Sequence, residues 1–217
     1  MTATTETSPP MARSKRRRLV IGAATLAVLA AIALDTTVIR IGSEQDMAEA
    51  GFSPEKFGAE TFPVVKESII SRAVDAVTLS QAVAADKAAA AKQYGVAAGV
   101  GAVIPVRFTG VLGDAKSGIY NVDVEGLVGD TRIRIQTGPA INGTELRDAT
   151  GDIKFGGFKN QIEYQNAGAA LNNAMKQAVL AGIDTANLTG RTVSVTGAFT
   201  LVNPKNWLVT PVEIVVQ

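Results

Sequence analysis

Hydrogen-bonding and aromatic side chains that could bind a ligand gather in three short stretches of the 217-residue chain. The first is a Gly- and Pro-containing segment that ends in an Arg-Asp pair, and an arginine fork recognises carboxylates and hydroxyl groups. The second opens a predicted helix, whose N-terminus favours anionic and polar groups. The third is a turn before the last predicted strand. The candidate ligand-binding residues are Arg147, Asp148, Asn160, Gln161, Glu163, Tyr164 and Trp207.

Each stretch also has an explanation that needs no ligand. Arg147 and Asp148 can form a local ion pair within a turn. Asn160 and Glu163 have the spacing of a capping box, which satisfies backbone donors at the start of a helix. Trp207 follows an Asn-Pro turn and could act as a lid over one end of the fold. Both interpretations stay open at this stage.

The chain has no recognisable catalytic centre. It contains no Cys and no His, which excludes thiol nucleophiles, Ser-His pairs and Cys/His zinc sites. Neighbouring carboxylates such as Glu145 and Asp148 come without a base, metal-ligand spacing or a phosphate-binding loop. We therefore expect a protein that is not an enzyme and that has no metal and no cofactor. A hydrolase that uses Asp148, Asp152 or Glu163 is the third hypothesis.

The charge balance argues against nucleic acid as a partner. There are 21 Lys+Arg and 20 Asp+Glu, a formal charge of +1, and aromatic residues make up only 5%. Without the five cations and one anion of residues 1–33, the rest carries 16 Lys+Arg and 19 Asp+Glu, a charge of −3. Neither the electrostatic attraction nor the stacking platform that nucleic acids require is present.

The N-terminal residues have the order of an export signal. A basic cluster between Arg13 and Arg18 precedes an apolar run, Leu19–Leu34. The signal is either cleaved after Ala33 or kept as a membrane anchor over residues 19–39, since a bilayer core needs about 20 residues. Residues 1–18 would then be a disordered cytoplasmic tail. The rest would lie at the periplasmic face of the inner membrane, or in the periplasm if the signal is cleaved.

The hydrophobic pattern of the exported part predicts an α+β fold. Residues 40–61 form a linker, and a single domain follows over 62–217. A helical period covers 64–94, and a period of two then marks three strands, a helix from Asn160 and further strands. This order fits an OB-like, five-stranded antiparallel β-barrel over 104–217, with a helix between strands three and four.

Two segments resemble a known family. Gly138–Asn172, which reads GPAINGTELRDATGDIKFGGFKNQIEYQNAGAALN, and Gly197–Trp207, which reads GAFTLVNPKNW, are similar to the bacterial family called domain of unknown function 2291, predicted periplasmic lipoproteins. The resemblance runs from about Phe62 to the C-terminus. It implies an exported envelope protein and an accessory role beside sugar ABC importers, and it carries no binding residues. The lipid-modified cysteine of a lipoprotein is missing, because Leu34-Asp35-Thr36 follows the apolar run.

Two functional hypotheses follow. The first is an anchored, non-catalytic protein that binds a small carbohydrate-like ligand or a component of an ABC transporter. The second is a structural or assembly module of the envelope, in which the helix over 64–94 mediates protein contacts and the barrel is filled by its own side chains.

Overall fold

The computed structural model describes residues 20–23, 25, 27–28 and 51–217. The predicted basic tail, most of the predicted signal or anchor segment and the first part of the predicted linker lie outside these residues. Among the described residues, no helix is both long enough and apolar enough to span a bilayer. The chain divides into two units, Met1–Glu49 and Ala50–Gln217, and the second holds all the elements discussed below.

Three helices stand where the sequence predicted a single one over 64–94. They are α3 (Pro54–Arg72), α4 (Ala76–Ala85) and α5 (Lys87–Tyr94). The short strand β1 (Val74–Asp75) separates α3 from α4. Two aspartates divide the segment, because each caps a new helix. Asp75 accepts hydrogen bonds from the backbone of Val77 and Thr78, and Asp86 does the same for Ala88 and Ala89. Since α3 begins at Pro54, the last part of the predicted linker is helical.

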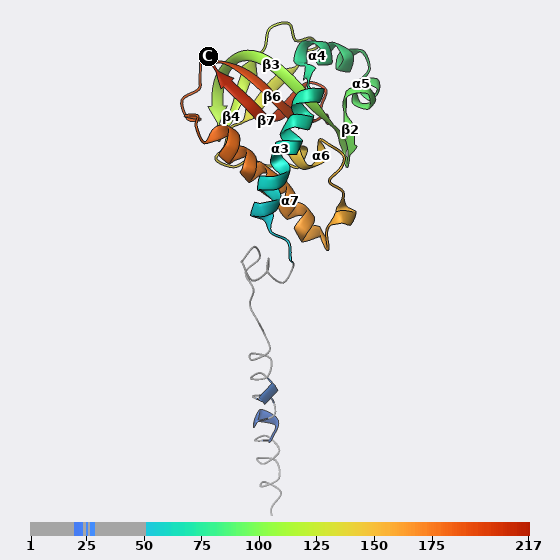
Figure 1. Cartoon of the computed structure of the whole chain (residues 1–217), viewed down its shortest axis with the longest axis vertical. Helices are drawn as coiled ribbons and strands as arrows, with labels where there is room; N and C mark the ends of the chain where they lie inside the picture. Colours follow the sequence, from blue (N-terminus) through green and yellow to red (C-terminus); the bar gives the residue numbers. More distant parts are fainter. Residues whose placement is uncertain (1–19, 24, 26, 29–50) are drawn as a thin grey trace, which may run out of the picture. The chain divides into compact units, whose positions relative to one another are not determined.

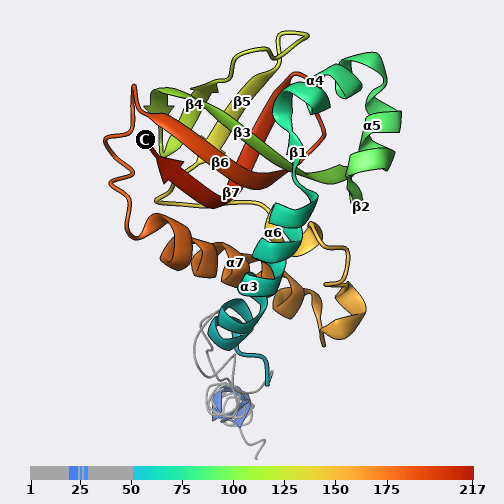
Figure 2. The same cartoon turned by 45° about the horizontal axis from the view of Figure 1, so that its top comes forward.

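The strands form one seven-stranded sheet in the order β1-β3-β4-β5-β7-β6, and β2 pairs with β3. β6 also pairs with β3, so five strands close into a ring (Figure 2). The bounds of these strands are β2 (Val96–Ala98), β3 (Gly101–Lys116), β4 (Ile119–Asp123), β5 (Arg132–Gln136), β6 (Thr192–Thr200) and β7 (Asn206–Val216).

The expected five-stranded antiparallel barrel is therefore wrong in two respects. Two additional strands, β1 and β2, extend β3, and the sheet is mixed because β1 runs parallel to β3 and β5 runs parallel to β7. β5 and β7 run in the same direction because all the other neighbours in the ring pair antiparallel. The connection between β5 and β6 carries the predicted helix as α7 (Gln161–Met175) and its π-helical continuation η2 (Lys176–Leu180). β3 is 16 residues long, which lets it pair with β4 and β6 to close the ring and with β1 and β2 as well.

Two hydrophobic cores stabilise the domain. The first fills the ring of strands and contains Trp207, whose ring stacks on Phe199 at a centroid distance of 4.7 Å. The second lies where α3 and α7 cover the outside of the sheet, and it includes Ile69 and Leu171, both fully buried. Figure 1 shows α3 crossing α7 at one end of the domain. They approach closely because Gly58 has no side chain, and a Cβ there would lie 2.6 Å from the carbonyl oxygen of Ala170.

Candidate functional site

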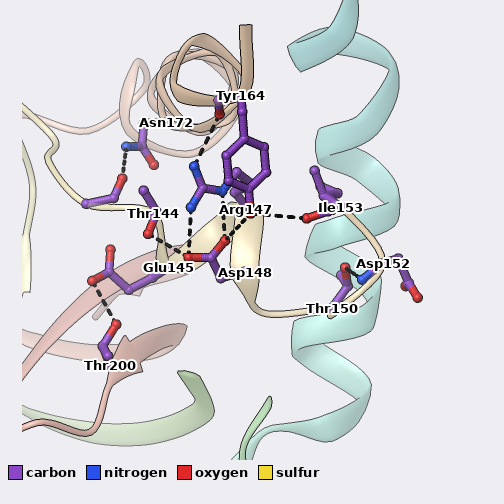
Figure 3. Close-up of polar contacts among 11 residues, drawn as sticks. Thr144, Glu145, Arg147, Asp148, Thr150, Asp152, Ile153, Tyr164, Asn172 and Thr200 are labelled. Carbon is purple, nitrogen blue, oxygen red and sulfur yellow. Dashed lines mark hydrogen bonds and ion pairs between the residues drawn. The ribbon is translucent and has the colours of Figure 1, made fainter. Parts of the chain in front are cut away.

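Six of the seven candidate residues lie on the short helix α6 (Glu145–Asp148) or at the start of α7, and three of them, Arg147, Asp148 and Tyr164, contact one another. α6 carries Arg147 and Asp148, and it packs against α7, which carries Glu163 and Tyr164. Figure 3 shows the Arg147 side chain between Asp148 and the Tyr164 ring. We call Arg147, Asp148, Thr144 and Tyr164 the Arg147 group.

Each nitrogen of the Arg147 guanidinium donates a hydrogen bond to a neighbour within the domain. Its Nε donates to Asp148 Oδ1 at 2.7 Å and its Nη2 donates to Asp148 Oδ2 at 3.1 Å, which is a bidentate pair. Its Nη1 donates to the backbone oxygen of Tyr164 at 3.2 Å. The Cζ atom lies 3.7 Å from the centroid of the Tyr164 ring, within cation–π distance. Only 10% of the Arg147 side chain is exposed.

Both carboxylate oxygens of Asp148 accept hydrogen bonds from within the domain. Besides the two bonds from Arg147, its Oδ2 accepts a hydrogen bond from Thr144 Oγ1 at 2.6 Å, and its Oδ1 lies 3.5 Å from the Tyr164 hydroxyl. That hydroxyl also donates to the carbonyl oxygen of Ile153 at 3.4 Å. The Arg147 group therefore fastens α6 and the following loop onto α7.

The polar residues at the start of α7 cap the helix. Asn160 Oδ1 accepts from the backbone N–H of Glu163 at 2.9 Å, and Glu163 Oε2 accepts from the backbone N–H of Lys159 at 2.8 Å. The second bond differs from a standard capping box by one residue, because the donor precedes the cap. Glu163 is 5% exposed, and its Oε1 has no hydrogen-bond partner among the described residues. Gln161 is exposed at the first position of the helix.

Trp207 is not near these residues. It begins the ring-facing part of β7, it has no exposed surface, and its indole N–H donates to the carbonyl oxygen of Pro204 at 3.0 Å. The Trp207 ring is therefore packed in the first core, and its N–H already has a partner within the domain.

Glu145 has a perturbed acidity. Burial raises the pKa of its carboxyl above the usual value, and the nearby Asp148 charge acts in the same direction. Hydrogen bonds from the Glu145 backbone and from Thr200, whose Oγ1 donates at 3.2 Å, oppose this rise. A raised pKa means that the folded state favours the protonated carboxyl.

We expect Glu145→Gln to stabilise the domain at neutral pH and to have a smaller effect in acid. Because the folded-state pKa is raised, the stability that the wild-type carboxyl contributes is present at low pH and is lost as pH rises through the folded pKa. Glutamine keeps an oxygen for the Thr200 bond without the charge. Urea unfolding of both proteins from about pH 4 to about pH 8 tests this. A variant that is less stable than wild type at neutral pH would contradict it.

The polar outer face of β4 and β5 was not among the candidate sites predicted from the sequence. Two open pockets of about 520 Å³ each adjoin on this face and share Thr131 and Arg132. One extends to Asn203, Lys205 and Asn206 after β6. The other lies at the end of β4, where the outward Asn121 and Asp123 and the buried Val122, Val124 and Ile133 all line it. The alternation within β4 and β5 already placed Asn121, Asp123, Arg132 and Arg134 on their polar faces.

The described part of the chain holds no group of acidic side chains that could bind a metal ion. The expectation that the protein has neither a metal nor a cofactor rests on the sequence.

The closed ring of strands with a helix between its third and fourth members defines an OB-fold. An OB-fold protein from Thermotoga maritima is similar in structure, with a TM-score of 0.62 and 20% sequence identity over 77% of this chain and 99% of that chain. The chain belongs to the family described as "Predicted periplasmic lipoprotein (DUF2291)", whose sequence profile matches residues 24–215. No curated protein matches significantly in sequence.

Membership of this family confirms the predicted resemblance and places the protein outside the cytoplasm, as the N-terminal sequence indicated. The family description includes a lipid anchor, yet this chain has no cysteine to carry one.

Proposed function

We propose that the chain is a non-catalytic periplasmic binding module and that its ligand surface is the outer face of β4 and β5. The observation that carries the proposal is the pair of adjoining pockets on this face. Asp123 lines one of these pockets and Arg132 lines both, and neither side chain has a hydrogen bond or ion pair to any described residue. In OB-folds, the corresponding strands and adjacent loops bind oligosaccharides and oligonucleotides.

The strand register determines which polar side chains share this face. Asn121 pairs with Arg134, and Arg132 pairs with Asn206 across β5 and β7. The face therefore carries two arginines on its central strand, with an amide or carboxylate on the strands beside them. Arg134 Nε donates to Asn206 Oδ1 at 3.2 Å, which orients that amide.

This arrangement fits a small polar ligand with hydroxyl and carboxylate groups. Arginine forks and amides bind such groups, and pockets of this volume accommodate one small molecule. The outward positions of β4 and β5 hold no aromatic residue, so bases of a nucleic acid would find no stacking partner. A sugar or sugar acid is the ligand class that we propose, in agreement with the sugar importers that the family resemblance implies.

The Arg147 group is the other candidate ligand site, and we propose that its role is structural. Its guanidinium and carboxylate already bind each other, and the Thr144 hydroxyl and the Tyr164 ring occupy their remaining faces. A ligand would have to displace these bonds.

Titration of the full chain in detergent with neutral and acidic sugars tests the proposal. We expect at least one sugar to bind, and we expect Arg132→Gln to weaken that binding about tenfold or more through loss of a charged hydrogen-bond pair. Lys92→Gln removes the same charge from the exposed surface of α5 and should leave affinity unchanged. If no sugar binds, or if Arg132→Gln binds as wild type, the proposed surface is wrong.

A structural or assembly module is the second candidate, because the first core fills the ring of strands and the Arg147 group is satisfied internally. Crosslinking in intact cells separates the two candidates. A protein partner that is still captured by Arg132→Gln, together with an absence of sugar binding, would favour the assembly module.

A further inference from the structure

The segment between η1 (Phe155–Gly157) and the first turn of α7 exposes two large apolar side chains. Phe155 is 53% exposed and Ile162 is 50% exposed, and both are flanked by exposed lysines, Lys154 and Lys159. A Cβ added at either glycine of η1 would meet nothing within 4 Å. The two glycines of η1 therefore border open space, and we call Phe155 and Ile162 the apolar tip.

The apolar tip is supported from below by a chain of aromatic rings. Phe155 meets Tyr164 edge-on at 5.7 Å, and Tyr164 lies 5.4 Å from Phe158. Tyr164 is in turn fixed by Arg147. Because these contacts hold Phe155 in place, its exposure is built into the fold.

The N-terminal segment of the chain joins the domain beside this tip. The ring of Phe52 lies 5.6 Å from Phe158 and 5.5 Å from Phe57. Figure 1 shows the start of α3 and the orange segment before α7 at the same end of the domain. Phe52, among the first described residues of the domain, therefore lies at the end that carries the apolar tip.

The length of that segment limits how far this end can lie from a membrane. The predicted signal or anchor ends at Ile39, and the twelve residues 40–51 span at most about 40 Å when fully extended. If residues 19–39 are retained in the bilayer, residues 40–51 keep Phe52, and with it the nearby apolar tip, within about 40 Å of the lipid.

We propose that Phe155 and Ile162 form a membrane-docking surface that enters the boundary between headgroups and acyl chains of a phospholipid bilayer. Apolar side chains insert at this depth, while the stem of Lys154 lies along the apolar region with its ammonium group among the headgroups. Two such side chains bind weakly alone, but a tether raises their effective concentration at the surface. Docking would fix the orientation of the β4–β5 face relative to the membrane.

Tryptophan fluorescence of the full chain in vesicles tests this surface. The variant Phe155→Trp is reconstituted into vesicles of phosphatidylethanolamine and phosphatidylglycerol, with or without bromine on the acyl chains, and vesicle-bound protein is isolated by flotation. We expect brominated lipid to remove most of the emission of the introduced tryptophan and to leave the buried native Trp207 bright.

The matched control is Val202→Trp, because Val202 is 52% exposed and lies beside the start of α5, where its carbonyl accepts a bond from Lys87. Its emission should not change with bromination. A second variant, Phe155→Trp with Ile162→Asp, should lose most of the quenching because half of the tip becomes charged. Equal emission from Phe155→Trp in both kinds of vesicle, or a full chain that does not float with vesicles, would overturn the proposal.

Discussion

Trp207→Ala is expected to lower the free energy of unfolding by about 3–5 kcal/mol. Trp207 has no exposed surface, and its ring is stacked on Phe199 in the core that fills the ring of strands. Alanine would leave a cavity there and would also leave the carbonyl oxygen of Pro204 without its donor. Denaturant unfolding followed by far-UV circular dichroism measures the loss, since the variant has no tryptophan fluorescence.

The control for Trp207→Ala is Val202→Ala, which truncates an exposed side chain in the connection between β6 and β7. It should change the free energy of unfolding by less than about 0.5 kcal/mol. A loss below about 1 kcal/mol for Trp207→Ala would mean that the ring is not part of a packed core. If the variant instead keeps its stability and loses affinity for a sugar, Trp207 is a binding residue, as one of the sequence hypotheses had it.

The strands could be predicted because their signal is local. Residues 119–125 alternate between apolar and polar side chains, and the structure buries Tyr120 and Val122 while it exposes Asn121 and Asp123. The order of strands and helix was then enough to predict an OB-like fold. The mixed pairing could not be predicted in the same way, because nothing in a single strand states whether its neighbour runs parallel or antiparallel.

The helices show where periodicity misleads. The sequence pattern predicted one helix that runs through both Asp75 and Asp86, but an aspartate that accepts bonds from the next backbone N–H groups begins a helix. Both positions satisfy the helical period and the capping preference equally well. Tertiary packing decides between them, because β1 pairs with β3 at Asp75 and so breaks the helix.

The candidate site was only partly visible in the sequence. The proximity of Arg147 and Asp148 is local, and the cap at Asn160 follows from its spacing to Glu163. The contact between Arg147 and Tyr164 depends on how α6 packs against α7, which no spacing specifies. For the same reason, the pockets at Arg132 required the structure, since they combine β4 and β5 with the loop after β6.

Asp148→Asn should lower the free energy of unfolding by about 3–5 kcal/mol, because it leaves the Arg147 guanidinium almost buried and without a counter-charge. The side chains of Arg147 and Asp148 are only 10% and 15% exposed, so water screens their interaction weakly. The amide group of asparagine would also place donors against the donors of Arg147. Urea unfolding measures the loss. The control is Asp152→Asn, at an exposed aspartate in the loop after α6, which should change stability by less than about 0.5 kcal/mol.

The double variant Arg147→Met with Asp148→Asn separates charge from packing. Methionine removes the unpaired cation while keeping an unbranched side chain near the Tyr164 ring, so we expect it to restore much of the stability that Asp148→Asn loses. If the double variant is no more stable than Asp148→Asn, the loss comes from the Thr144 and Tyr164 contacts and not from an uncompensated charge. If Asp148→Asn is as stable as wild type, the pair does not fasten α6 to α7, and a ligand role for these two residues becomes the better explanation for placing them together.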